Sequence, residues 1–269
     1  MLFRSALATA TISGGSVNGV TVTSPGSGYA VPPKVIFSAP PSGTTATGFA
    51  TIGNVAQLSA KRLDWTALEQ PLDALLAQFS VAGITLTGAG DLVINRPTSD
   101  LTLEKAVTKD GSVSITAQRL TLNGPVTAGD FSSTRTQNVT LKATGADLIV
   151  NFPVTAPATA TLQADAGAII GSAGGLVTAT DLVVSALNGV TLTTKVDTVA
   201  GRVSGSGAGI TIDEADDILV GTSVTKNLSA NNGPVKVTAG GVMTVNRVDA
   251  GPTGSVALTA GSNLLQAVV

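Results

Sequence analysis

Hydrophobic and polar residues alternate in short runs along most of this chain. The runs recur at steps of 21–28 residues and are centred on Ile115, Leu141, Leu162, Val184, Ile212, Val237 and Leu258. A period of two places neighbouring side chains on opposite sides of a strand, so each run predicts a strand that is buried on one side. A unit of this length cannot bury its own hydrophobic side, but stacked units cover one another. The pattern therefore predicts a parallel β-solenoid.

A second repeat has a spacing of 28 residues. It comprises the sequences DLVINRPTSD, RLTLNGPVTA and DLIVNFPVTA, at positions 91–100, 119–128 and 147–156. We predict one column of stacked leucines, made of Leu92, Leu120 and Leu148. The asparagines that recur with them are Asn95, Asn123 and Asn151. These amides fit a ladder along the solenoid or left-handed turn positions, which we favour, or a row of ligand-binding side chains.

Aspartate precedes several of the hydrophobic strands. The positions are Asp91, Asp147, Asp181 and Asp217. Aspartate is unfavourable within a strand, but in the preceding turn its carboxylate can accept hydrogen bonds from backbone N–H groups. The four positions therefore predict recurrent turns.

Three regions differ in composition. Residues 1–60 are rich in Gly, Ser and Pro and predict a module of short strands, whereas residues 81–269 predict a solenoid of roughly seven or eight coils. Residues 61–80 form a connector, in which the spacing of leucines over 64–79 favours a short helix that caps the solenoid. The expected fold class is all-β. Tandem immunoglobulin-like sandwiches are a weaker alternative, since they usually bury aromatic residues and only 3% of this chain is aromatic.

The composition excludes several classes of function. The chain has no Cys and no His, so it contains no disulfide, no thiol nucleophile, no His-ligated metal and no Ser-His-Asp triad. A net charge of −2 with 12% charged residues argues against nucleic acid as a partner. No hydrophobic run is long enough to predict a membrane span.

The densest group of carboxylates is Asp213, Glu214, Asp216 and Asp217. A solvated turn between two strands is the interpretation that we favour. The same residue types fit a Ca²⁺ site, because calcium is bound by several carboxylate and carbonyl oxygens. They also fit the carboxylate pair of a glycosidase. Apart from this calcium candidate, we expect no cofactor.

The repeats resemble those of a known family. The stretches 175–186, 192–197 and 209–220 are similar to repeats of filamentous-haemagglutinin-like adhesins and other giant β-strand-repeat surface proteins of bacteria. The resemblance implies a right-handed parallel β-helix, export to the bacterial cell surface, and a stalk or adhesive role without catalysis. Its partner would be a glycan or protein on a host or neighbouring cell. The alternative is a carbohydrate-active β-helix enzyme, a polysaccharide hydrolase or lyase, that uses Asp213, Asp216 or Asp217.

Overall fold

The computed structural model describes residues 7–13, 16–24, 62–67, 80–87, 90–129, 136–221 and 227–267. The chain divides into two compact units, Met1–Ser59 and Ala60–Val269. In the first unit, β1 (Leu7–Ser13) and β2 (Ser16–Ser24) form an antiparallel pair. The described part of the N-terminal module therefore contains strands.

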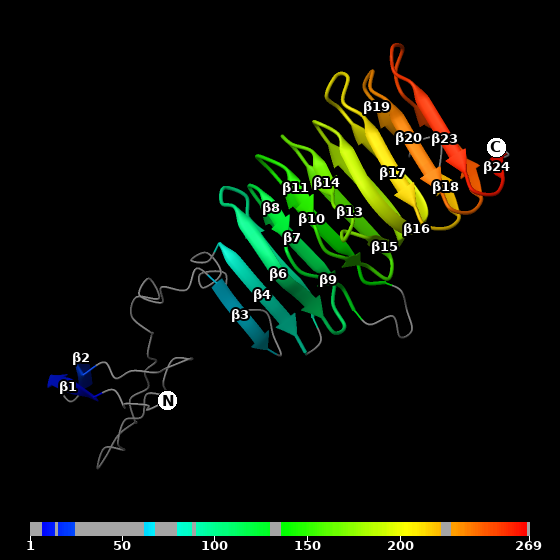
Figure 1. The fold of residues 1–269 in the computed structure, drawn as a ribbon. Coiled ribbons are helices and arrows are strands. Elements are labelled where there is room, and N and C mark those ends of the chain that lie inside the picture. The colour runs from blue at the N-terminus through cyan, green and yellow to red at the C-terminus, as the bar shows by residue number, and fades with distance from the viewer. Residues whose placement is uncertain are drawn as a thin grey trace. The chain divides into compact units, whose positions relative to one another are not determined.

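The second unit is a parallel β-solenoid of about eight coils (Figure 1). Every strand pairing that the structure describes within this unit is parallel, and the described residues contain no helix. The all-β parallel β-helix expected from the sequence is confirmed. The right-handed winding stays a prediction, in line with the general handedness of parallel crossovers.

The strands of the solenoid stack in three columns. The first column contains β5 (Leu92–Arg96), β7 (Val113–Ala117), β10 (Val139–Ala143), β13 (Thr159–Ala164), β19 (Leu228–Ala230) and β22 (Val248–Asp249). The second contains β8 (Leu120–Leu122), β11 (Leu148–Val150), β14 (Ile169–Gly171), β17 (Ile210–Glu214), β20 (Val235–Ala239) and β23 (Val256–Ala260). The third contains β9 (Val126–Thr127), β12 (Val154–Thr155), β18 (Ile218–Val220), β21 (Met243–Val245) and β24 (Leu264–Gln266). Longer strands pass from one column to the next, and these are β4 (Val81–Leu86), β6 (Leu101–Thr108), β15 (Val177–Ala186) and β16 (Val190–Val203).

The winding begins before the region expected to be solenoid. Strand β3 (Arg62–Ala67) pairs in parallel with β4. The helix predicted over 64–79 is therefore wrong for residues 64–67, because strand pairing prevails over the helical spacing of the leucines. Residues 68–79, where the rest of that helix was expected, lie outside the described residues.

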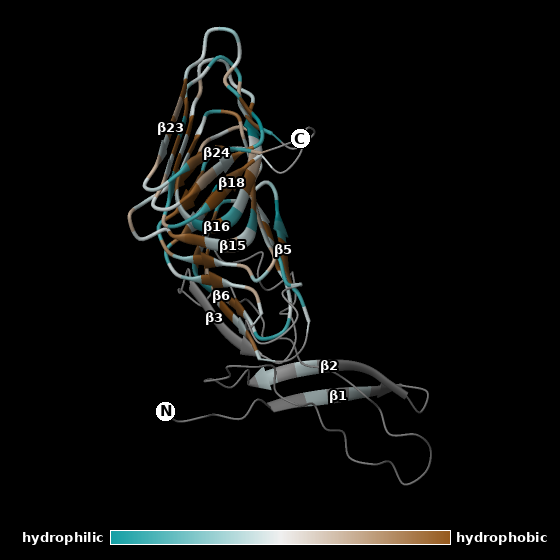
Figure 2. Cartoon of the chain, turned by 90° about the vertical axis from the view of Figure 1, so that its right-hand side faces the viewer, coloured by the Kyte–Doolittle hydropathy of each residue, from teal (hydrophilic) through white to brown (hydrophobic). Residues whose placement is uncertain are grey.

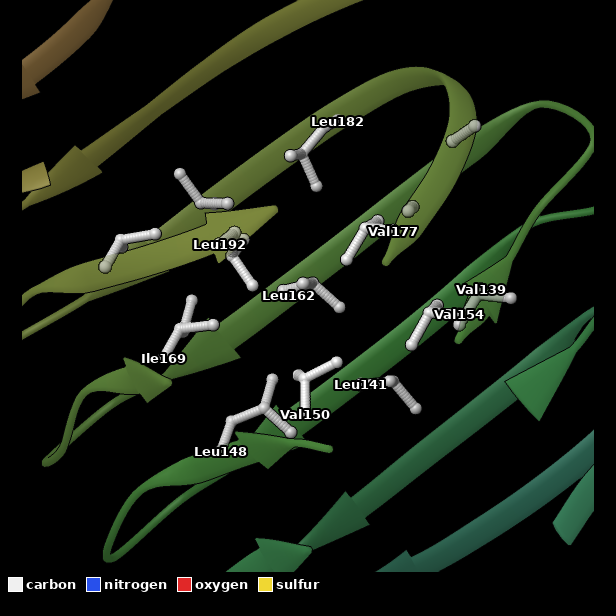
Figure 3. Packing of buried hydrophobic residues seen from close by; sticks show 14 of the residues in the cluster. Val139, Leu141, Leu148, Val150, Val154, Leu162, Ile169, Val177, Leu182 and Leu192 are labelled. Carbon is white, nitrogen blue, oxygen red and sulfur yellow. The ribbon is translucent and has the colours of Figure 1, made fainter. Parts of the chain in front are cut away.

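Alternation along each strand builds the core. In β10, Val139, Leu141 and Ala143 are fully buried, while Thr140 and Lys142 are partly exposed. In-register pairing places Leu141 between Ile115 and Leu162 of the neighbouring coils. Figure 3 shows Leu141, Leu162 and Leu182 on successive coils, and Figure 2 shows the hydrophobic stretches along the stacked strands. Burial of these aliphatic layers is the main source of stability for such a stack.

The predicted leucine column is only partly correct. Leu120 and Leu148 are in register with each other, and the residue below them is Leu101. Leu92 instead pairs with Val113 in the first column. The sequence around Leu92 repeats the Leu-Asn-Pro pattern, but its strand lies in the first column. The repeat could not reveal this difference, because strands of all three columns share the same alternation.

The seven residues on which the predicted strands are centred also lie in two different columns. Ile115, Leu141, Leu162 and Val184 are in register in the first column, whereas Ile212, Val237 and Leu258 are in register in the second. The change occurs at a short coil, in which Gly201 lies 17 residues after its partner Val184. Gly201 has a φ of 153°, and a Cβ there would lie 2.1 Å from the carbonyl oxygen of Val184. Only glycine fits this close approach.

The strand-opening aspartates bind the next coil. Oδ1 of Asp91 accepts a hydrogen bond from the N–H of Ser112 at 2.7 Å, and Oδ1 of Asp147 accepts one from Ala168 at 2.8 Å. Asp217 accepts one from the N–H of Val242 at 2.6 Å, while Asp181 accepts one from the Thr198 hydroxyl. The predicted turn role is confirmed for the three that bind N–H groups, and their donors lie 21 to 25 residues further along the chain.

Replacing Asp147 with alanine should lower the free energy of unfolding by about 1 kcal/mol, because the N–H of Ala168 loses its acceptor at a partly buried turn. Asp147→Asn keeps an acceptor oxygen and should retain most of the stability. Urea unfolding of the two variants measures the difference. Equal stability of both variants and the wild type would show that the hydrogen bond does not hold the coils together.

Candidate functional site

The four clustered carboxylates point in different directions. Glu214 lies at the end of β17, where the alternation turns it inward together with Ile210 and Ile212, and its side chain is 3% exposed. Asp213 has the opposite orientation and is exposed. Asp213 and Glu214 are adjacent in a strand, so the strand alternation predicts that one side chain points outward and the other inward.

The Glu214 carboxylate accepts four hydrogen bonds. Oε2 accepts from the Thr194 hydroxyl at 2.6 Å and from the N–H of Val196 at 3.1 Å. Oε1 accepts from the N–H groups of Ala215 and Asp216, at 2.8 and 3.3 Å. Burial raises the pKa of Glu214 above its ordinary value, and hydrogen bonds from Thr194, Asp216 and Val196 oppose that rise. Glu214 therefore holds β16 to β17 from inside the coil, and solvent reaches little of its side chain.

The other two carboxylates have separate partners. Oδ2 of Asp216 lies 3.5 Å from the Lys195 ammonium, in an ion pair whose side chains are both more than half exposed. Asp217 accepts the hydrogen bond from Val242 described above. Among the described residues, no group of three or more acidic side chains is arranged to hold a metal ion. The structure therefore does not bring Asp213, Glu214, Asp216 and Asp217 together as a calcium site.

Calcium should leave the midpoint of thermal unfolding unchanged, because the carboxylates of Glu214, Asp216 and Asp217 are already engaged in separate hydrogen bonds and ion pairs. Differential scanning fluorimetry with and without calcium is the measurement. A rise in the midpoint that the double variant D216N/D217N removes would contradict this arrangement.

An acidic surface nevertheless forms beside the third column. Two shallow hollows lie there, and both are lined by Asp197. Asp216 and Lys195 line the first hollow, and Asp217 lines the second. Asp197 is not among the residues predicted from the sequence, although alternation along β16 turns both Lys195 and Asp197 outward. Carboxylate and hydroxyl groups share this surface with apolar side chains such as Val196 and Ile218.

The asparagine repeat forms a ladder of two. Nδ2 of Asn151 donates a hydrogen bond to Oδ1 of Asn123 at 3.1 Å. The predicted amide ladder is thus confirmed for Asn123 and Asn151. Asn95 lies in β5, in register with Thr116, and the ladder does not include it. Asn95 is separated from Asn123 and Asn151 because its strand, like that of Leu92, lies in the first column.

Comparison with known proteins gives no relative: no family model, no curated protein and no solved structure matches this chain. Within the part of the chain that the structure describes, there is no helix of the length and hydrophobicity that a membrane crossing needs. The fold, the amide ladder and the acidic surface are therefore the basis for assigning a function.

Proposed function

We propose that this chain is a non-catalytic stalk and adhesive segment of an exported bacterial surface protein, similar to filamentous-haemagglutinin-like adhesins. The observation that carries the proposal is the continuous stack of parallel coils around an aliphatic core. Each coil adds about 4.8 Å to the stack, so eight coils extend a binding surface by about 40 Å. A stack of this kind is stiff, because every coil is joined to the next by backbone hydrogen bonds along three columns.

The outward side chains support an adhesive role. Successive coils place residues such as Thr140 and Thr161, or Lys142 and Gln163, beside each other at a regular spacing. Lys142 also forms an ion pair with Asp165 at 2.8 Å, and this contact lowers the pKa of Asp165. Such rows offer hydroxyl, amide and charged groups to a long ligand that lies along the solenoid. The partner would be a glycan or protein on a host or neighbouring cell.

Adhesion of protein-coated beads tests the proposal. Beads that carry the full chain should adhere to bacterial or host cells more strongly than beads that carry albumin, under gentle flow. Adhesion equal to that of the albumin beads would contradict the adhesive role.

The alternative function is cleavage of a polysaccharide. The specific observation in its favour is that Asp197 lines both hollows, together with Asp216 in one and Asp217 in the other. A panel of neutral and acidic polysaccharides, assayed for new reducing ends and unsaturated uronates, separates the two functions. Our proposal predicts no cleavage. Cleavage that is lost in D197N and D216N would overturn it in favour of the enzyme.

A further inference from the structure

We propose that the turn between β11 and β12 is a contact site for a neutral glycan, formed by the rings of Phe152, Pro125 and Pro153 with the amides of Asn123 and Asn151. This inference rests on the proposed adhesive function and assigns a place and a ligand class to it. The turn lies between the second and third columns of the solenoid.

Phe152 is the first component of the site. Its side chain is 45% exposed, and it is the one aromatic residue among the large exposed hydrophobic residues of the described chain. Only 3% of the chain is aromatic, and burial of a phenyl ring would stabilise the fold. An exposed ring at an ordered turn of a rigid solenoid therefore indicates a contact surface.

The coil below leaves the ring uncovered. Leu122 pairs with Val150 and Val126 pairs with Val154, and three residues lie between these partners in both coils. Gly124 therefore occupies the position below Phe152. A Cβ at Gly124 would lie 1.7 Å from the backbone oxygen of Glu104, so no side chain fits at this position. In the coil above, Gly174 and Gly175 approach the backbone of Asn151 and Val150 in a similar way.

Two prolines extend the apolar surface. The same register places Pro125 below Pro153, and both residues are exposed. The N–H of Val126 donates to the carbonyl oxygen of Pro153 at 3.0 Å, which fixes the spacing of the two turns. Rigid rings lose little conformational entropy when they bind a ligand. The surface is thus both apolar and preorganised.

The amide ladder supplies the polar groups. In the hydrogen bond between the two side chains, Asn151 uses its Nδ2 and Asn123 uses its Oδ1. The Nδ2 of the exposed Asn123 and the Oδ1 of Asn151 keep the capacity to donate and accept. The Ser172 hydroxyl, which donates to the carbonyl oxygen of Asn151, continues this polar row on the next coil.

This combination matches the chemistry of a sugar. A pyranose ring has a face of C–H groups that packs on an apolar ring, and a rim of hydroxyls that both donate and accept hydrogen bonds. The five side chains of the site carry no charge, which favours a neutral glycan over an acidic one. Phe152, Pro125 and Pro153 would contact the C–H face, and Asn123 and Asn151 would bind hydroxyls.

Affinity electrophoresis of the full chain tests the site, with native gels that contain a soluble β-glucan, a galactomannan or polygalacturonate. We expect one of the two neutral polysaccharides to retard the wild type. Phe152→Ala should weaken binding about tenfold, whereas Phe152→Trp should retain it. Ile170→Ala is the matched control, because Ile170 is 42% exposed on the neighbouring strand β14 and should bind like the wild type.

In the gel assay, the glycan site is overturned by a wild type that neither neutral polysaccharide retards, or by a Phe152→Ala variant that binds as well as the wild type. Binding of a proline-rich peptide, lost in Phe152→Ala without any glycan binding, would overturn it in favour of a protein partner. The bead assay separates these failures from that of the proposed function. If wild-type beads adhere and Phe152→Ala beads adhere equally, the function stands and this site is wrong.

Discussion

Replacing Leu162 with aspartate is expected to abolish the cooperative folding of the solenoid. Leu162 is fully buried and lies in register between Leu141 and Val184. An aspartate there would place a charge among aliphatic side chains without a partner, at a cost of several kcal/mol, on the scale of the whole stability of a domain. Leu162→Ala should lower the free energy of unfolding by about 2–5 kcal/mol.

Thr161→Asp is the matched control for this experiment. Thr161 is adjacent in sequence and lies on the outward side of the same strand, in register with Thr140 and Val183. Its substitution should change the stability by about 1 kcal/mol or less, because the charge stays in contact with water. Circular dichroism and urea unfolding compare the variants. Similar unfolding curves for Leu162→Asp and Thr161→Asp would show that Leu162 is not in a closed core.

The second large effect is expected at Glu214. In Glu214→Gln, one acceptor oxygen becomes an NH₂ group that faces backbone N–H donors, so either the buried N–H of Val196 or those of Ala215 and Asp216 lose their acceptor. We expect a loss of about 2–4 kcal/mol in the free energy of unfolding. Asp213→Asn is the same chemical change at the neighbouring exposed position, and it should alter stability by about 0.5 kcal/mol or less. Equal effects of the two substitutions, measured by urea unfolding, would contradict the buried network.

Glu214 also predicts a pH dependence. Since burial raises its pKa in the folded chain, the unfolded chain releases this proton first as the pH rises past its ordinary value of 4.5. The contribution of Glu214 to stability is therefore complete below pH 4.5 and decreases as the pH rises through the raised pKa. The stability difference between wild type and Glu214→Gln should shrink over this interval. A difference that grows with pH would show that hydrogen bonding, rather than burial, dominates the pKa of Glu214.

The sequence predicted the local structure of the solenoid better than its register. Alternation around Leu141 and Leu162 is enough to identify inward positions, because each strand has a period of two wherever it lies in the coil. The same alternation occurs in all three columns, so the repeat could not show that Leu92 belongs with Val113. Coil lengths vary, so the sequence pattern passes from the first column at Val184 to the second column at Ile212, although the first column itself continues through Gly201 and Leu228.

The candidate sites were predictable to a different extent. The amide ladder of Asn123 and Asn151 follows from the 28-residue repeat. The inward direction of Glu214 follows from its place in β17, two residues after the inward-facing Ile212. The exposure of Phe152 could not be predicted, because it depends on the glycines that adjacent coils place around it. Asp197 and Asp216 are 19 positions apart in sequence and meet at one hollow only through the stacking of β16.

Disulfide formation between engineered cysteines tests the central claim, that successive coils lie in parallel register, most directly. The chain has no Cys of its own. Thr140 and Thr161 are register partners on the outward side of neighbouring coils, where the Cα atoms of paired strands lie about 4.8 Å apart. Thr140 and Gln163 are offset by two residues, which separates their Cα atoms by about 8 Å, beyond the reach of a disulfide. We predict rapid oxidation of the double variant T140C/T161C and little oxidation of T140C/Q163C; equal oxidation of both pairs, or a preference for the offset pair, would contradict the stacked solenoid.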